Sequence, residues 1–118
     1  MPNILIVDDQ RYVRELLSEE LTDEGYRVSC AGDAESIWTC LKDSPPDLVL
    51  LDLYLNGFEG WEILEDIKRE VPHLPVIIVT AYDSYAEDPR LAQAAGYVVK
   101  SFISFGELKQ KIADVIVH

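Results

Sequence analysis

The sequence is organised around an apolar run that ends on an acid. Residues 48–51 read Leu-Val-Leu-Leu, and Asp52 follows directly. A strand without a polar face is typical of a parallel sheet that helices cover on both sides. In such sheets, ligands bind at the edge where the carboxyl ends of the strands meet. Asp52 is therefore expected at a ligand-binding edge.

Three further apolar runs end on a polar residue in the same way. They are residues 4–7 before Asp8 and Asp9, residues 76–79 before Thr80, and residues 97–99 before Lys100. Any one of these polar residues alone would fit a solvated turn. Because parallel strands end at a common edge, the five together predict one shared site.

Amphipathic or capped segments alternate with the strands and predict helices over 11–25, 33–41, 61–71, 89–95 and 104–116. A half-exposed edge strand is expected over 26–30. Five strand–helix units with right-handed crossovers predict an α/β fold. The expected architecture is a flavodoxin-like (βα)5 doubly wound parallel five-stranded sheet, of order 2-1-3-4-5, in a three-layer sandwich. This order places Asp8, Asp9 and Asp52 together.

Two local expectations accompany this fold. Residues 56–60 form a loop, because glycine and asparagine interrupt the pattern there. Cys30 and Cys40 form no CxxC pair and stand in apolar patterns, which predicts small buried thiols.

The carboxylate cluster predicts a bound cation. Two carboxylates about 4 Å apart repel by roughly 4 kcal/mol at an effective dielectric near 20. Oxygen ligands without His or Cys favour a hard ion, and an open site that retains water favours Mg²⁺. With the amine of Lys100 and the hydroxyl of Thr80 nearby, the site suits phosphoryl transfer, with Asp52 as the nucleophile.

Composition limits the partners and the compartment. The chain has 118 residues, of which 48% are hydrophobic, which is typical of one domain spanning residues 1–118. A net charge of -12 argues against direct nucleic-acid binding. The sequence lacks a long apolar segment and a basic leader, so we expect no membrane insertion and a cytoplasmic location.

Taken in order, these motifs make the chain resemble a response-regulator receiver domain of two-component signalling. The matching motifs are the acid pair after residues 4–7, Asp52, Thr80-Ala81 and Lys100. The resemblance implies that Asp52 accepts a phosphoryl group from the phosphohistidine of a sensor histidine kinase or phosphotransfer protein. It also implies a signalling domain rather than an enzyme, acting on an effector through the fourth helix, the fifth strand and the last helix.

Further roles are implied by the same resemblance. Asp9, Asp52 and the backbone carbonyl of Tyr54 would bind Mg²⁺, with Asp8 acting through water. Thr80 and Tyr97 would form the switch pair.

The chain departs from the family pattern after the lysine, where the usual proline is Ser101. Because a cis bond before a non-proline residue costs about 3 to 4 kcal/mol, we predict a trans Lys100–Ser101 peptide. Gln93 stands where the family usually has a glycine, so the fourth helix is the least regular part of the prediction.

The sequence also bears on three rival functions. An aspartyl-nucleophile phosphatase would usually carry a second aspartate two residues after Asp52, where this chain has Tyr54. A nucleotide- or flavin-binding module would need a glycine-rich phosphate loop after Val7. A non-phosphorylated protein-interaction module on the same fold would not need the complete acidic site with Lys100.

Overall fold

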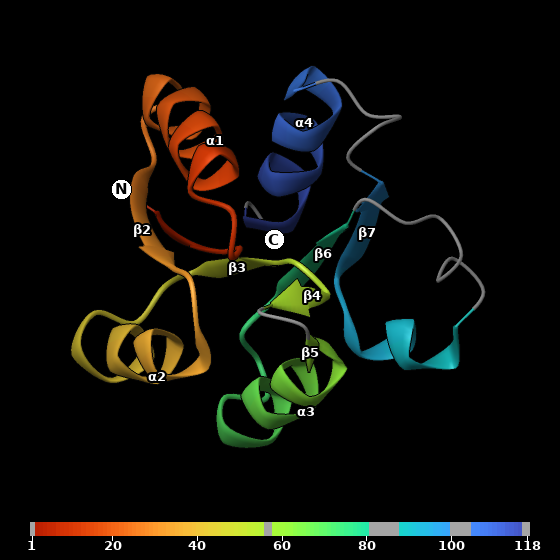
Figure 1. Cartoon of the computed structure of the whole chain (residues 1–118). Helices are drawn as coiled ribbons and strands as arrows, with labels where there is room; N and C mark the ends of the chain where they lie inside the picture. The colour runs from red at the N-terminus through yellow and green to blue at the C-terminus, as the bar shows by residue number, and fades with distance from the viewer. Residues whose placement is uncertain (1, 56–57, 81–87, 100–104, 117–118) are drawn as a thin grey trace.

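Five strands form a single parallel sheet in this computed structural model, which describes residues 2–55, 58–80, 88–99 and 105–116. The strands are β1 (Asn3–Val7), β2 (Arg27–Ala31), β3 (Leu48–Leu51), β6 (Val76–Thr80) and β7 (Gly96–Val99). Their order in space is β2-β1-β3-β6-β7 (Figure 1). This is the predicted 2-1-3-4-5 order, so the flavodoxin-like fold is confirmed.

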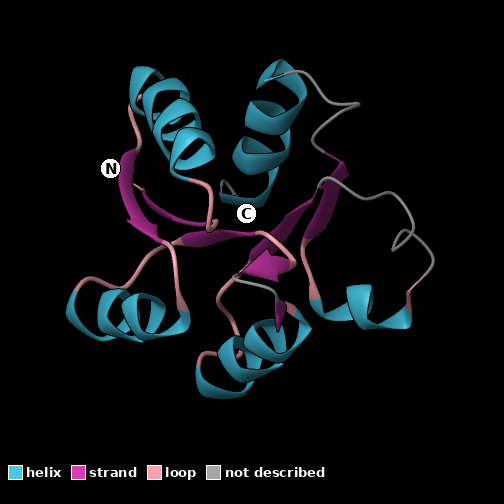
Figure 2. Cartoon of the chain, in the orientation of Figure 1, coloured by secondary structure: helices cyan, strands magenta, loops and turns pink. Residues whose placement is uncertain are grey.

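Helices cover both faces of the sheet. They are α1 (Arg11–Asp23), α2 (Ala34–Asp43), α3 (Trp61–Glu70) and α4 (Phe105–Ile116). Figure 2 shows α1 and α4 on one face, and α2 and α3 on the other. The three-layer arrangement explains why the inner strands lack a polar face.

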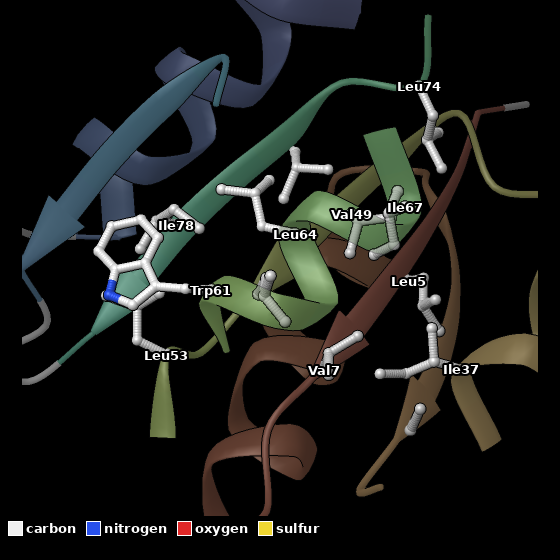
Figure 3. Close-up of a cluster of buried hydrophobic side chains, with 13 residues drawn as sticks. Leu5, Val7, Ile37, Val49, Leu53, Trp61, Leu64, Ile67, Leu74 and Ile78 are labelled. Atoms are coloured by element: carbon white, nitrogen blue, oxygen red, sulfur yellow. The ribbon is translucent and has the colours of Figure 1, made fainter. Parts of the chain in front are cut away.

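Alternate residues of each strand enter two separate cores. Ile4 and Leu50 pack with Leu17 of α1 and Ile112 of α4. Leu5 and its neighbours pack with α2 and α3 in the second core, part of which Figure 3 shows; its labelled members include Val49, Leu64, Ile67 and Ile78. The period of two in a strand thus divides each apolar run between the two faces.

Helix boundaries follow the signals in the sequence. The Asp33 carboxylate accepts a hydrogen bond from the Ser36 backbone N–H at 2.8 Å and so caps α2. This bond to the Ser36 backbone lowers the pKa of Asp33. Gly25 has a φ of 94°, the left-handed conformation that glycine adopts without strain after a helix. Both positions agree with the predicted ends.

The segment after Asp52 differs from the prediction of a loop over 56–60. Tyr54–Leu55 (β4) and Phe58–Glu59 (β5) pair as antiparallel strands. The two residues between them in the sequence are Asn-Gly, the dipeptide most typical of a two-residue hairpin. This dipeptide between two short strands favours a hairpin over a loop.

The predicted fourth helix is also corrected. Residues Pro89–Gln93 form a short 3₁₀ helix (η1) instead of a helix over 89–95. It begins with Pro89 after an Asp88 cap, and by Ala95 the chain already donates to the Val76 carbonyl of the sheet. That early return leaves too few residues for an α-helix of the expected length.

The prediction of a buried Cys30 is wrong, because this residue is exposed on the edge strand β2, whereas Cys40 is half-buried against the core. An edge strand has a neighbour on one side only, so an apolar alternation there does not ensure burial. Lys100, Ser101 and the peptide between them lie outside the described residues. No helix in the described ranges combines the length and the apolar character needed to cross a bilayer.

Candidate phosphoacceptor site

Three carboxylates meet where β1 and β3 end. Asp8, Asp9 and Asp52 each offer a carboxylate oxygen, and these oxygens lie within 4.8 Å of one another. Asp8 is 2% exposed and Asp52 is 7% exposed, while Asp9 is exposed. β1 and β3 are adjacent and parallel, with Val7 opposite Leu51, so the next residue of each strand reaches the same point. Two nearly buried acids and an exposed one therefore form a site open on one side.

The turn after β1 holds Asp8 at several atoms. Its backbone N–H donates to the Ala31 carbonyl at 3.1 Å, and its carboxylate accepts from the Gln10 backbone N–H at 2.9 Å. The Asp8 carbonyl accepts a hydrogen bond from Nη1 of Arg14, in the first turns of α1, at 2.7 Å. The turn is thus fixed on β2 and on α1 at the same time.

Asp52 is held from the sheet and from the N-terminus of α3. Its backbone N–H donates to the Val7 carbonyl at 2.9 Å. Gly60, the residue before α3, donates its backbone N–H to the Leu53 carbonyl. A Cβ at Gly60 would lie 2.6 Å from the Asp52 carbonyl oxygen, so only glycine permits this approach without a shift.

Thr80 is fully buried at the end of β6, beside Val99 of β7. Tyr97 is half-buried and lies opposite Ile78, two residues before Thr80. Since residues two apart in a strand share a face, Thr80 and Tyr97 lie on the same face of the sheet, the one covered by α2 and α3. Lys100 follows Val99 in the sequence and is outside the described residues.

The donor set fits a hard divalent cation. Its ligand atoms are carboxylate oxygens, two of the three residues are nearly buried, and their negative charges repel at this separation. Tyr54, whose carbonyl is a predicted fourth ligand, begins β4 two residues after Asp52. Few protein ligands and an open side leave room for water, which suits Mg²⁺.

Two arginines, one beside this site and one beside the start of α3, were not identified from the sequence. Arg14 stands three and seven residues before Leu17 and Leu21, the buried residues of α1, so it continues the buried stripe of the helix. A charged residue in such a stripe is the signal that could have identified it. Arg90 was also missed; its guanidinium lies 4.3 Å from the centre of the Trp61 ring, at the start of α3.

Comparison with known proteins agrees with this geometry. Residues 4–113 match the family model described as the response regulator receiver domain. Over 102 residues, the chain is 36% identical to the probable transcriptional regulatory protein TcrX of Mycobacterium tuberculosis, covering 84% of this chain and 43% of that protein. It is 37% identical over 81 residues to the transcriptional regulatory protein AfsQ1 of Streptomyces coelicolor, covering 69% and 36%. The chain thus spans less than half the length of these relatives.

Solved structures resemble the whole chain. The response regulator TrrA of Thermotoga maritima, in complex with Mg²⁺-BeF, superposes with a TM-score of 0.89 at 39% identity and covers 98% of this chain and 99% of that one. A second structure, of histidine kinase ThkA in complex with TrrA, gives the same values.

Proposed function

Because this chain belongs to the response regulator receiver domain family, we propose that Asp52 is its phosphoacceptor in a two-component phosphorelay. The observation that carries the proposal is the meeting of the Asp8, Asp9 and Asp52 carboxylates at one edge of the sheet. The donor would be the phosphohistidine of a sensor histidine kinase or of a phosphotransfer protein. A complex of the relative TrrA with a histidine kinase supports this choice of partner.

Asp8, Asp9, Asp52 and the Tyr54 carbonyl would hold Mg²⁺. A bound Mg²⁺ neutralises the clustered carboxylates and the oxygens of the incoming phosphoryl group. Asp8 and Asp52 hold two of these negative charges at nearly buried positions, where water screens them least. The site therefore has a reason to prefer the metal-bound state.

In the transfer, a carboxylate oxygen of Asp52 attacks phosphorus. The P–O bond to Asp52 forms while the P–N bond to the donor imidazole breaks, and the imidazole nitrogen leaves with the electron pair of that bond. The backbone of Asp52 is held by its hydrogen bond to Val7, so the nucleophilic side chain projects from a fixed point during the approach of the donor.

Thr80 and Lys100 would receive the phosphoryl oxygens, through a hydroxyl and an ammonium group. Thr80 and Tyr97 would then act as the switch pair. Their common face of the sheet supports this role, because a movement of the Thr80 hydroxyl would take place on the side of the sheet where the Tyr97 ring packs.

The output surface would comprise η1, β7 and α4, the counterparts of the fourth helix, fifth strand and last helix of the prediction. The two relatives named transcriptional regulatory proteins support an effector domain or protein as the partner. We place this domain, residues 1–118, in the cytoplasm, and assign it no direct contact with nucleic acid because of its charge of -12.

Intact-mass measurement after incubation with acetyl phosphate and Mg²⁺ tests the proposal. We expect one added phosphoryl group on the wild type and none on Asp52→Asn. Asp47→Asn is the matched control: Asp47 precedes the same strand at its opposite end, where its carboxylate accepts from the Asn3 backbone N–H. Modification of Asp52→Asn to the wild-type level, or an unmodified wild type, would contradict the proposal.

Family membership favours this function over an aspartyl-nucleophile phosphatase and over a flavin-binding module. The non-phosphorylated interaction module is the remaining alternative on the same fold. The same experiment separates it, because such a module would gain no phosphoryl group from acetyl phosphate.

A further inference from the structure

Arg14 reaches from α1 to the first carbonyl beyond the end of β1. Its Nη1 donates to the Asp8 carbonyl oxygen at 2.7 Å. The donor is charged, which makes this hydrogen bond stronger than one between neutral groups. Arg14 is six residues from Asp8, so the contact joins a helix to the turn that precedes it.

The direction of this carbonyl matters for both acids of the pair. The peptide group between Asp8 and Asp9 is planar, so the direction of the Asp8 carbonyl fixes the plane from which the Asp9 backbone continues. Asp8 itself is fixed at its N–H by Ala31 and at its carboxylate by Gln10. Arg14 adds a contact at the carbonyl, and the orientation of this peptide plane is one of the factors that set the direction of the Asp9 side chain.

Gly32 makes room for the guanidinium. It follows β2 directly, and a Cβ placed on it would lie 2.9 Å from Nη1 of Arg14. It would also lie 3.7 Å from the Asp8 carbonyl oxygen, which is an ordinary contact. A methyl group at this position would thus displace the Arg14 side chain while leaving the carbonyl in place.

We propose that Arg14 is a positioning residue for the metal site, holding the Asp8–Asp9 peptide so that both carboxylates face Asp52. The inference rests on the proposed role of this cluster in binding Mg²⁺. A positioning role and a purely electrostatic role predict opposite changes in Mg²⁺ affinity when Arg14 is replaced. Removing a positive charge beside a cation site should strengthen cation binding if charge alone matters, whereas loss of positioning should weaken it.

Titration calorimetry with Mg²⁺ separates these two effects. For Arg14→Met we expect roughly tenfold weaker binding, the lower range for the loss of a group that orients metal ligands. Arg11→Met is the matched control, since Arg11 lies on the same helix, carries the same charge, and pairs with Glu15 at a position 83% exposed. That variant should bind Mg²⁺ as well as the wild type or slightly better.

Two further variants separate the positioning effect from the loss of a charge and from unfolding. Gly32→Ala keeps Arg14 but displaces it, so it should also weaken Mg²⁺ binding. Arg14→Lys keeps a charged donor and should restore part of the affinity. Thermal melts followed by circular dichroism establish that each variant is folded, and Gly32→Ala serves if Arg14→Met is not.

The inference is overturned if Arg14→Met and Gly32→Ala bind Mg²⁺ as tightly as Arg11→Met, even when their melting temperatures fall. That result would make Arg14 structural only. A wild type that binds no Mg²⁺ would instead overturn the proposed function, and the positioning role with it.

Discussion

Gly60 lies against the backbone of Asp52, so closely that a Cβ on Gly60 would be 2.6 Å from the Asp52 carbonyl oxygen and 3.0 Å from the Leu53 Cα. The beginning of α3 is therefore packed directly against the two residues that follow β3.

Gly60→Ala should destabilise the domain and disturb Asp52. The added methyl group meets backbone atoms, which cannot rotate away, so we expect a loss of about 1 to 3 kcal/mol in the free energy of unfolding. Urea unfolding measures this change. Gly96→Ala is the control, because its Cβ would contact only the Ile77 side chain, at 3.6 Å, and the expected change is within about 1 kcal/mol.

Mg²⁺ should stabilise the wild type by binding the folded state. At a free Mg²⁺ concentration ten times the Kd, the expected gain is about 1.4 kcal/mol, measured by thermal or urea unfolding. Asp52→Asn should show a smaller gain. NaCl at matched ionic strength is the control for screening of the net charge of -12. Equal stabilisation by NaCl and Mg²⁺ would argue against a specific site.

Lys109 connects α4 to the end of α1. Its Nζ lies 2.9 Å from a Glu20 carboxylate oxygen and 3.2 Å from a Glu24 carboxylate oxygen. The hydrogen bond to Glu20, which has the larger effect, and the one to Glu24 raise the pKa of Lys109 above its ordinary value of 10.5. Because the pKa of Lys109 is higher in the folded than in the unfolded protein, its interactions with Glu20 and Glu24 stabilise the fold fully below pH 10.5. This stabilisation is lost as the pH rises through the pKa of Lys109 in the folded protein. Lys109→Met should therefore melt below the wild type at pH 8.

The difference between Lys109→Met and the wild type should shrink in melts at progressively higher pH. Lys111→Met, at an exposed position on the same helix, controls for the general loss of a lysine. A difference from wild type that stays constant across this range would show that Lys109 acts through its packing instead of its charge.

Arg90 attaches η1 to α3 by stacking on Trp61, at 4.3 Å from the ring centre. It is also paired with Asp88, and the hydrogen bonds from Arg90 lower the pKa of Asp88 to about 2. A double-mutant cycle with Arg90→Met and Trp61→Phe should give a coupling energy of about 0.5 to 1 kcal/mol in urea unfolding. The coupling should be equal at pH 7 and pH 5, because Asp88 is ionised at both. A coupling of zero would mean that the stack adds nothing to stability.

The sequence predicted the sheet well because its strands are buried on both faces, which leaves apolar runs such as residues 76–79 with one interpretation. The meeting of Asp8, Asp9 and Asp52 could be predicted for the same reason. Asp8 and Asp52, 44 residues apart, meet because parallel strands end at one edge.

The features that the sequence did not predict depend on tertiary contacts, which the pattern of apolar residues does not record. The distance from Arg14 to the Asp8 carbonyl and the space that Gly32 leaves involve three separate elements, and no local pattern records their meeting. The exposure of Cys30 is a property of the edge of the sheet, and the short η1 reflects an early return of the chain to Val76. In each case, tertiary geometry overrode a local preference.

The backbone bond from Asp52 to Val7 has a mechanical consequence. It continues the ladder between β1 and β3, the middle strand of the sheet, so neither strand can slide or rotate at this point without breaking paired amides. Asp52 is thus tied through its backbone to the paired strands of the sheet. A rearrangement that starts at this site is therefore expected in side chains and connecting segments, while the pairing of β1 with β3 keeps its register.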